Sequence, residues 1–160
     1  KDFLKQGKQP DVWVLQGGAS TKDAYLKRRP EKKQKHREVL QSTPFYFVDE
    51  NKNLYVHGGF EPGIPMEEQD KQVLMWSRRL WDNRWMYDAD EKTYPEFNEI
   101  YVGHTSVWSF SHNPIKHGNV WFMDTGGGWE GKLSLMDVET KEVFQSDVVL
   151  DLYPETRGRN

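Results

Sequence analysis

Short apolar runs separated by polar turns recur along the chain after residue 44, and these runs predict β-strands. Two pairs of runs flank short polar turns and predict β-hairpins, and two single runs predict further strands. The predicted strands cover residues 45–48, 54–57, 99–102, 120–123, 132–138 and 142–146. The segments 113–118 and 124–128 are rich in Gly and Asn or Asp and are predicted to be turns.

Three segments predict helices. A hydroxyl residue three positions before Asp23 resembles a capping box and predicts a helix that starts near Thr21. Residues 31–40 are highly charged and predict a solvated helix, which Pro44 should end. Residues 67–81 predict one longer helix. Its apolar face is expected to carry Val73, Trp76 and Leu80.

Composition places the chain among folded domains and limits its chemistry. The 160 residues are 36% hydrophobic and 14% aromatic, which is enough for one domain with a core. A net charge of −3 gives no basic excess, so no nucleic-acid partner is expected. No apolar run is long enough for a membrane span, and a cytoplasmic location is expected. Without cysteine, a metal must be bound by imidazole, carboxylate, amide or water, which favours Mn, Fe, Zn or Mg.

Two histidines follow predicted strands directly. His57 ends the run Leu54-Tyr55-Val56 and precedes two glycines, and His104 follows Ile100-Tyr101-Val102-Gly103. Glycine beside a histidine allows a sharp turn and the close approach of an ion. A single strand-end histidine is as often structural as functional. Two in the same setting, 47 positions apart, predict metal ligands that a sheet brings together.

The remaining histidines lack this setting and are interpreted as surface or turn residues. They are His36, His112 and His117. Arg78 and Arg79 allow two interpretations. Cations are favoured near a helix C-terminus, and a guanidinium also binds phosphate through two parallel hydrogen bonds. The residues alone favour the first.

Five motifs, taken in order, resemble the bacterial and phage branch of the phosphoprotein phosphatases, which are calcineurin-like metallophosphoesterases. The motifs are Trp13-Val14-Leu15-Gln16-Gly17-Gly18, Val56-His57-Gly58-Gly59, Trp76-Ser77-Arg78, Val102-Gly103-His104-Thr105 and Asp124-Thr125-Gly126. The resemblance spans about residues 11–144. It implies that His57 and His104 bind one ion of a two-metal centre containing Mn, Fe or Zn, and that Arg78 contacts the substrate phosphate. It also implies an α/β fold, a four-layer α/β/β/α sandwich, of which this chain carries the second sheet, its helix and the two histidine strands.

The chain departs from the family pattern in one respect. The family's Asp-x-His motif, its metal-bridging Asp and its Gly-Asn-His motif do not occur before His57. We therefore expect residues 1–160 to form the C-terminal part of a single calcineurin-like phosphoesterase domain, or to receive the missing half from another chain. No catalytic residue is then assigned within this chain, and the isolated chain is expected to be inactive.

The function expected of the complete protein is metal-dependent phosphoester hydrolysis, as in a serine/threonine protein phosphatase. Its substrate is expected to be a phosphorylated protein or a small phosphoester. Dinucleoside tetraphosphate hydrolysis and a catalytically dead scaffold stay open. So does a β-rich domain that binds a sugar or peptide through exposed Trp81, Trp85 and Trp129. Unpaired sheet edges predict a homodimer.

Overall fold

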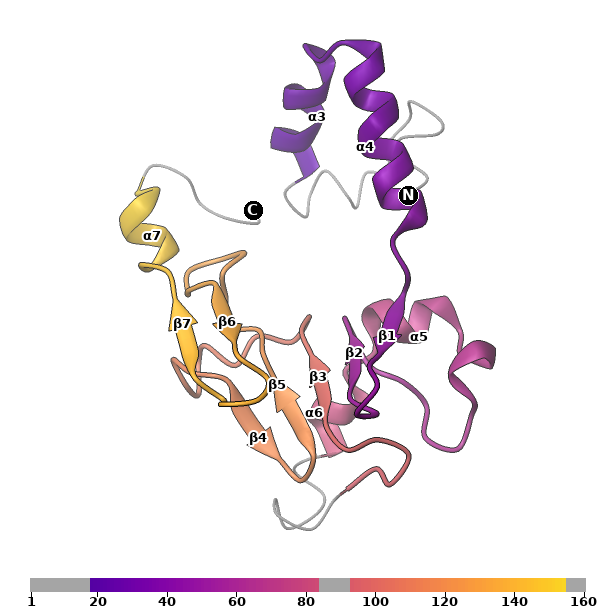
Figure 1. The fold of residues 1–160 in the computed structure, drawn as a ribbon. Helices are drawn as coiled ribbons and strands as arrows, with labels where there is room; N and C mark the ends of the chain where they lie inside the picture. Colours follow the sequence, from indigo (N-terminus) through magenta and orange to yellow (C-terminus); the bar gives the residue numbers. More distant parts are fainter. Residues whose placement is uncertain (1–17, 84–92, 155–160) are drawn as a thin grey trace. The chain divides into compact units, whose positions relative to one another are not determined.

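The chain forms two compact units in the computed structural model, which describes residues 18–83 and 93–154 (Figure 1). The first unit includes the helices before residue 45, and the second spans Phe45–Tyr153. In the described part, five α-helices accompany a five-stranded mixed sheet and a two-stranded hairpin, so the mixed α/β class is confirmed. No helix of this part is both long and apolar enough to cross a membrane.

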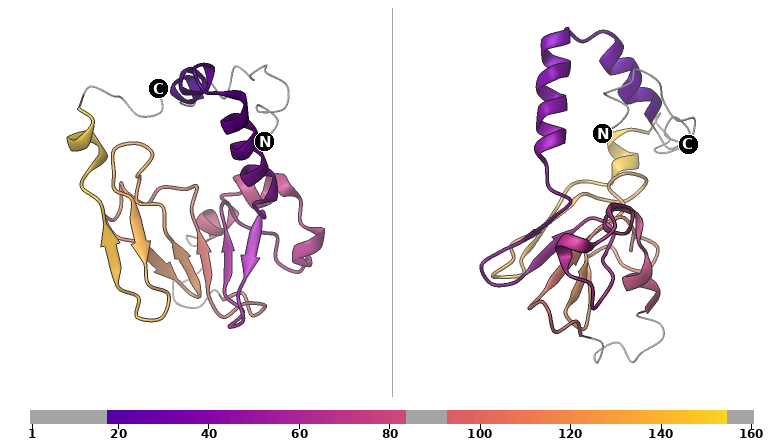
Figure 2. Two further views of the ribbon diagram at one scale, coloured as in Figure 1. Left: turned by 45° about the horizontal axis from the view of Figure 1, so that its top comes forward. Right: turned by 90° about the vertical axis from the view of Figure 1, so that its right-hand side faces the viewer.

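The first unit contains helices α3 (Ala19–Leu26) and α4 (Pro30–Ser42), which lie side by side in Figures 1 and 2. The rings of Tyr25 and His36 meet between them at 5.6 Å. The predicted capping box is wrong, because α3 begins at Ala19 and no side chain caps it. The solvated helix is confirmed, since α4 buries no residue. Thr43 takes the extended conformation that a following proline imposes, and this ends α4.

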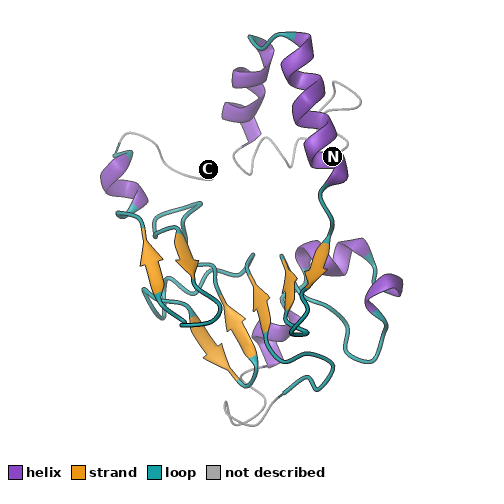
Figure 3. Ribbon diagram, viewed as in Figure 1, coloured by secondary structure: helices purple, strands orange, loops and turns teal. Residues whose placement is uncertain are grey.

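Strands β1 to β5 form one sheet in the order β1-β2-β3-β5-β4 (Figure 3). Strands β2, β3 and β5 pair in parallel, and the two edge strands pair antiparallel with their neighbours. Strands β6 and β7 form a separate hairpin. The seven strands are β1 (Tyr46–Val48), β2 (Leu54–Val56), β3 (Ile100–Val102), β4 (Ile115–His117), β5 (Val120–Phe122), β6 (Ser134–Met136) and β7 (Val143–Gln145).

Strand β4 corrects the prediction that residues 113–118 form only a turn. The register pairs His117 with Val120, which leaves Gly118 and Asn119 as a two-residue connection. Gly118 has φ +55°, as the first central position of such a tight hairpin turn requires. The Gly-Asn pair therefore connects two strands, and the turn is shorter than the predicted segment.

The predicted single helix over residues 67–81 is wrong, because three short pieces replace it. They are η2 (Met66–Glu68), α5 (Lys71–Trp76) and α6 (Arg79–Asn83). Asp70 is extended, and its side chain accepts a hydrogen bond from the Gln72 amide, which starts α5 anew. Ser77 is also extended, and its hydroxyl accepts from the Arg79 amide at 3.2 Å. The predicted apolar face changes as a result: Trp76 is 52% exposed, whereas Leu74 is buried.

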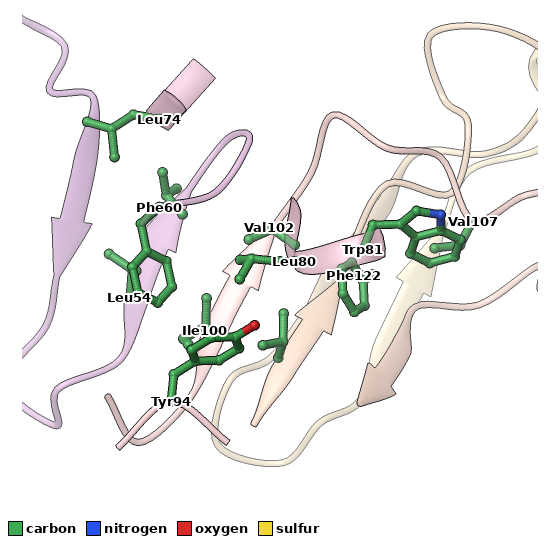
Figure 4. Packing of buried hydrophobic residues seen from close by; sticks show 12 residues of the cluster. Leu54, Phe60, Leu74, Leu80, Trp81, Tyr94, Ile100, Val102, Val107 and Phe122 are labelled. Atoms are coloured by element: carbon green, nitrogen blue, oxygen red, sulfur yellow. The ribbon is translucent and has the colours of Figure 1, made fainter. Parts of the chain in front are cut away.

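One face of the five-stranded sheet carries the core (Figure 4). Alternate residues of β2, β3 and β5 point to this face, where α6 covers them with Leu80 and Trp81. The buried set is Leu54, Val56, Phe60, Leu74, Leu80, Trp81, Tyr94, Ile100, Val102, Val107, Val120 and Phe122. The short helix α7 (Val149–Leu152), which the sequence did not predict, buries none of its residues.

The opposite face carries an aromatic row around one half-buried acid. Tyr55 stacks on Tyr101 with ring centroids 5.1 Å apart. Glu99 accepts hydrogen bonds from Tyr101 Oη at 2.6 Å and from Trp121 Nε1 at 3.1 Å. It also pairs with Lys141, from the turn between β6 and β7. Burial alone would raise the pKa of Glu99, but these hydrogen bonds and one from Lys116 outweigh it and lower the pKa to about 2.

Candidate metal centre

The two predicted metal ligands leave the sheet from neighbouring parallel strands. Val56 of β2 is in register with Val102 of β3, and both strands end there. The pairing continues one step further, since the Gly103 amide donates to the His57 carbonyl at 2.9 Å. His57 therefore follows β2 directly, and His104 follows β3 after one glycine. The carboxyl ends of parallel strands are the edge at which open α/β sheets bind ligands.

This arrangement brings the two imidazoles into contact. Their ring centroids lie 5.1 Å apart, and the ring planes are inclined by 62°. Two histidines bound to one ion, with metal–nitrogen distances near 2.1 Å and a ligand angle between 90° and 109°, would have centroids roughly 4.6–5.3 Å apart. The observed separation fits two ligands of one shared ion.

The backbone at His104 has a conformation that side chains rarely adopt. Its φ is +64°, in the left-handed region that favours glycine. The Thr105 amide donates to the Gly103 carbonyl at 2.6 Å and closes a tight turn around His104. Strained residues of this kind cluster at ligand-binding sites. Here the turn directs the imidazole of His104 toward that of His57.

Helix α5 packs against the histidine pair at its C-terminal end. The indole of Trp76 meets the His104 ring edge-on, with centroids 5.3 Å apart. The Gly58 amide donates to the Leu74 carbonyl at 2.7 Å, which holds the residue after His57 against the helix. Sequence periodicity placed Trp76 on an apolar helix face and gave no sign of this tertiary contact.

Arg78 follows this helix end and differs from its neighbour Arg79. The guanidinium of Arg79 pairs with Glu61 at 3.4 Å. Arg78 is exposed, and none of the described residues forms an ion pair or hydrogen bond with its side chain. Arg78 is therefore the member of the pair whose guanidinium has no ion-pair or hydrogen-bond partner among the described residues.

A third strand end reaches the same edge of the sheet. Strand β5 continues into Asp124, whose carbonyl accepts from the Val107 amide at 2.7 Å and whose carboxylate accepts from the Gly126 amide at 2.9 Å. The first bond joins the loop after β3 to the end of β5, and the second lies within the turn after β5. Within the predicted turn at residues 124–128, Gly126 takes the left-handed conformation, with φ +81°. Asp124 thus acts on the backbone of the loop that carries His104.

The other histidines each have a structural contact of their own. His112 stacks on Trp108 with centroids 4.1 Å apart, and His117 meets Phe122 at 6.1 Å. His36 is hydrogen-bonded to the Tyr25 hydroxyl in the helical unit. None of them joins His57 and His104, so they serve as matched controls for the pair.

The proposed tryptophan surface is corrected in part. Trp81 is only 9% exposed and packs against Phe122 in the core, with centroids 5.1 Å apart, so it cannot stack on a ligand. Trp129 is 46% exposed. Trp85 and the motif at residues 13–17 lie outside the described residues.

The donor set supplies part of a metal centre. Two imidazoles suit Zn, Mn or Fe, which all accept nitrogen ligands. Within residues 18–83 and 93–154, no group of three or more His, Cys, Asp or Glu side chains is placed to bind one ion. The histidine pair therefore fits two positions around a metal, and further ligands are not found in the described part.

No family model matches the chain, and no curated protein matches it.

Proposed function

We propose that this chain contributes two metal ligands and a phosphate-binding arginine to a metal-dependent phosphoester hydrolase of the serine/threonine protein phosphatase type. The observation that carries the proposal is the contact between His57 and His104, whose rings lie 5.1 Å apart at the ends of adjacent parallel strands. The motif order in the sequence supports the same family. Under this proposal, the five-stranded sheet is one layer of a four-layer α/β/β/α sandwich.

Each residue has a separate role in the proposed site. His57 and His104 bind the ion through neutral imidazole nitrogens, and the tight turn at His104 fixes the direction of one of them. Divalent metals at such a site supply a water nucleophile at neutral pH and neutralise phosphoryl oxygens. Arg78 holds the phosphate through charge-assisted hydrogen bonds. Trp76 packs against the His104 ring and supports its orientation.

A second candidate function is phosphate binding without hydrolysis. It is favoured by one observation, namely that no carboxylate of the described residues joins the histidine pair to complete a metal site. A scaffold of this kind would retain Arg78 and the histidine pair at the strand ends, and it would bind a phosphorylated ligand without turning it over.

Calorimetric titration of the full chain with Mn²⁺ and Zn²⁺ tests the metal site. We expect binding that His57→Ala and His104→Ala each weaken at least tenfold, and that His112→Ala and His117→Ala leave unchanged. Equal effects of all four variants, or no binding by the unaltered chain, would remove the site. Binding of inorganic phosphate with and without Mn²⁺ then separates the two functions, since a scaffold binds phosphate without the metal, whereas the hydrolase site needs the metal to bind it. The chain alone is expected not to turn over p-nitrophenyl phosphate, and turnover with added Mn²⁺ would place the active site elsewhere.

A further inference from the structure

Charge is divided unequally between the two units. Among the described residues, the helical unit (18–44) has eight Lys or Arg and three Asp or Glu, a formal charge of +5. The described part of the sheet unit (45–83 and 93–153) has seven Lys or Arg and sixteen Asp or Glu, a formal charge of −9. The whole-chain charge of −3 conceals this asymmetry. A strong difference of sign between two parts of a chain is typical of a polyanion-binding segment.

Four of the cations gather around one open hollow of about 290 Å³ on the helical unit. Lys27, Arg28 and Arg29 occupy the connection between α3 and α4, and Lys32 lies in the first turn of α4. Ala24 is the remaining lining residue. All four cationic residues are exposed, and no acidic side chain of the described residues forms an ion pair with them.

The acidic residues of α4 limit the extent of this surface. Glu31 lies four positions before Lys35 and Glu38 lies three positions after it, so both share its side of the helix. The Glu38 carboxylate accepts a hydrogen bond from Gln34 at 2.9 Å. The cationic surface is therefore the hollow itself, at the α3–α4 connection and the first turn of α4.

Two features narrow the class of polyanion. A helix that lies on a membrane needs a broad apolar face, whereas the apolar residues of α4 after Pro30 are Val39 and Leu40 in its last turn. Four cations gather around one hollow without acidic ion-pair partners among the described residues, which suits a ligand that carries several phosphates. Lys and Arg side chains that neutralise several phosphates release condensed counterions, which supplies binding that is independent of sequence.

We propose that the α3–α4 helix pair binds the phosphate backbone of a nucleic acid strand without sequence preference, through Lys27, Arg28, Arg29 and Lys32. The surface lies in a different unit from the histidine pair, and the inference does not depend on the proposed function. The net charge of −3 led us to expect no nucleic-acid partner. The proposal replaces that expectation, because the net charge sums two units of opposite sign.

Fluorescence anisotropy of the full chain with labelled 20-nucleotide single strands of RNA and DNA of several sequences tests the proposal. With four phosphate contacts, affinity for a single strand should fall roughly 50-fold between 50 and 200 mM KCl. The double variant Lys27→Gln/Arg28→Gln should bind at least tenfold more weakly at 50 mM KCl. Its plot of log affinity against log salt should be less steep by about 1.4.

The matched control removes two exposed lysines of the sheet unit, Lys52→Asn and Lys71→Gln. It should leave affinity and salt slope unchanged, as should His57→Ala. Circular dichroism checks that both double variants are folded. The proposal is overturned if no strand binds at 50 mM KCl, or if the control pair loses as much affinity as the test pair. It is also overturned if polyglutamate or anionic phosphatidylserine vesicles displace the strand at equal charge concentration, since the surface would then serve an acidic protein or a membrane.

Discussion

Gly58 lies against the backbone of Trp76 so closely that a Cβ atom at position 58 would stand 2.7 Å from the Trp76 amide nitrogen. The same Cβ would meet the Met75 carbonyl carbon at 2.7 Å and the Ser77 nitrogen at 2.9 Å. These neighbours are backbone atoms, so no side chain can rotate to relieve the contact. The residue after His57 must be glycine if α5 is to keep Trp76 against His104.

Gly58→Ala is therefore expected to lower the free energy of unfolding by about 1–3 kcal/mol, as overpacking does elsewhere. It should also weaken metal binding, because the strand end and the helix end would separate. Gly59→Ala is the matched control, since its Cβ would meet Leu80 at an ordinary 3.5 Å. Urea unfolding measures both, and equal stability of the two variants would contradict the close approach at Gly58.

The left-handed conformation of His104 gives a second prediction, on the metal-free protein. Both His104→Ala and His104→Gly remove the imidazole, but only glycine adopts φ +64° without steric cost. His104→Gly should therefore be more stable than His104→Ala by about 1 kcal/mol. Thermal unfolding in the presence of a chelator measures the difference. If alanine were the more stable residue here, the turn at His104 would not be strained.

The two arginines after α5 should differ in their effect on phosphate. Arg78→Ala should weaken the binding of inorganic phosphate to the Mn²⁺-loaded chain by about tenfold or more, the loss expected for one charge-assisted hydrogen bond. It should leave Mn²⁺ affinity unchanged, because Arg78 is not a ligand. Arg79→Ala removes only an exposed pair with Glu61 and should change neither quantity. Loss of metal with Arg78→Ala, or a larger effect of Arg79→Ala, would contradict the assignment.

Glu99 gives a prediction on pH. Its pKa is about 2 in the folded chain, below the ordinary value of 4.5, so the folded state binds this proton less readily than the unfolded state. The stabilisation is therefore complete above about pH 5 and is lost as the pH falls from 4.5 toward 2. A shift of this size corresponds to at most about 3 kcal/mol.

Glu99→Gln should accordingly be less stable than the unaltered chain at pH 7 in urea unfolding. The difference between the two proteins should shrink at pH 3. Glu96→Gln, at an exposed glutamate close by in the sequence, should track the unaltered chain at both pH values. A difference that grew on acidification would show that Glu99 is not held as a carboxylate by Lys141, Tyr101 and Trp121.

Self-association stays a prediction, and the hairpin of β6 and β7 gives it a location. Leu135 and Phe144 are cross-strand partners, and they are 64% and 54% exposed. Apolar pairs on an exposed two-stranded hairpin favour contact between copies. Light scattering of the unaltered chain should show a dimer that Leu135→Lys dissociates. Leu26→Lys, at an equally exposed leucine of the helical unit, should leave the dimer intact.

The strands were the part of the fold that the sequence predicted best. Alternating runs on either side of a polar turn located both hairpins, since a period of two and a short turn determine register together. The helix over residues 67–81 failed because apolar periodicity continued across Asp70 and Ser77, two residues whose side chains cap helices and here interrupt one. Strand β4 was missed because three residues between turn formers give too little pattern to detect.

The candidate site was predictable only in outline. Placement of His57 and His104 directly after strands indicated that a sheet could bring them together. The order of strands in the sheet, which makes β2 and β3 neighbours, is a tertiary property that no local pattern contains. The same holds for the contact of Trp76 with His104. The cationic residues of the helix pair can be counted in the sequence. Their excess over acidic residues becomes apparent only when the boundary between the two units is known.

The parallel pairing of β2 with β3 has a consequence for the order in which the molecule assembles. A parallel pair cannot close through a tight turn, so the chain between Val56 and Ile100 must complete a long crossover before the two strands meet. Contacts of such high sequence separation form late, after the local hairpins. The imidazoles come together only at that step. Metal added during refolding should therefore bind in the last kinetic phase. The rate of metal binding would then report the rate at which β2 and β3 pair.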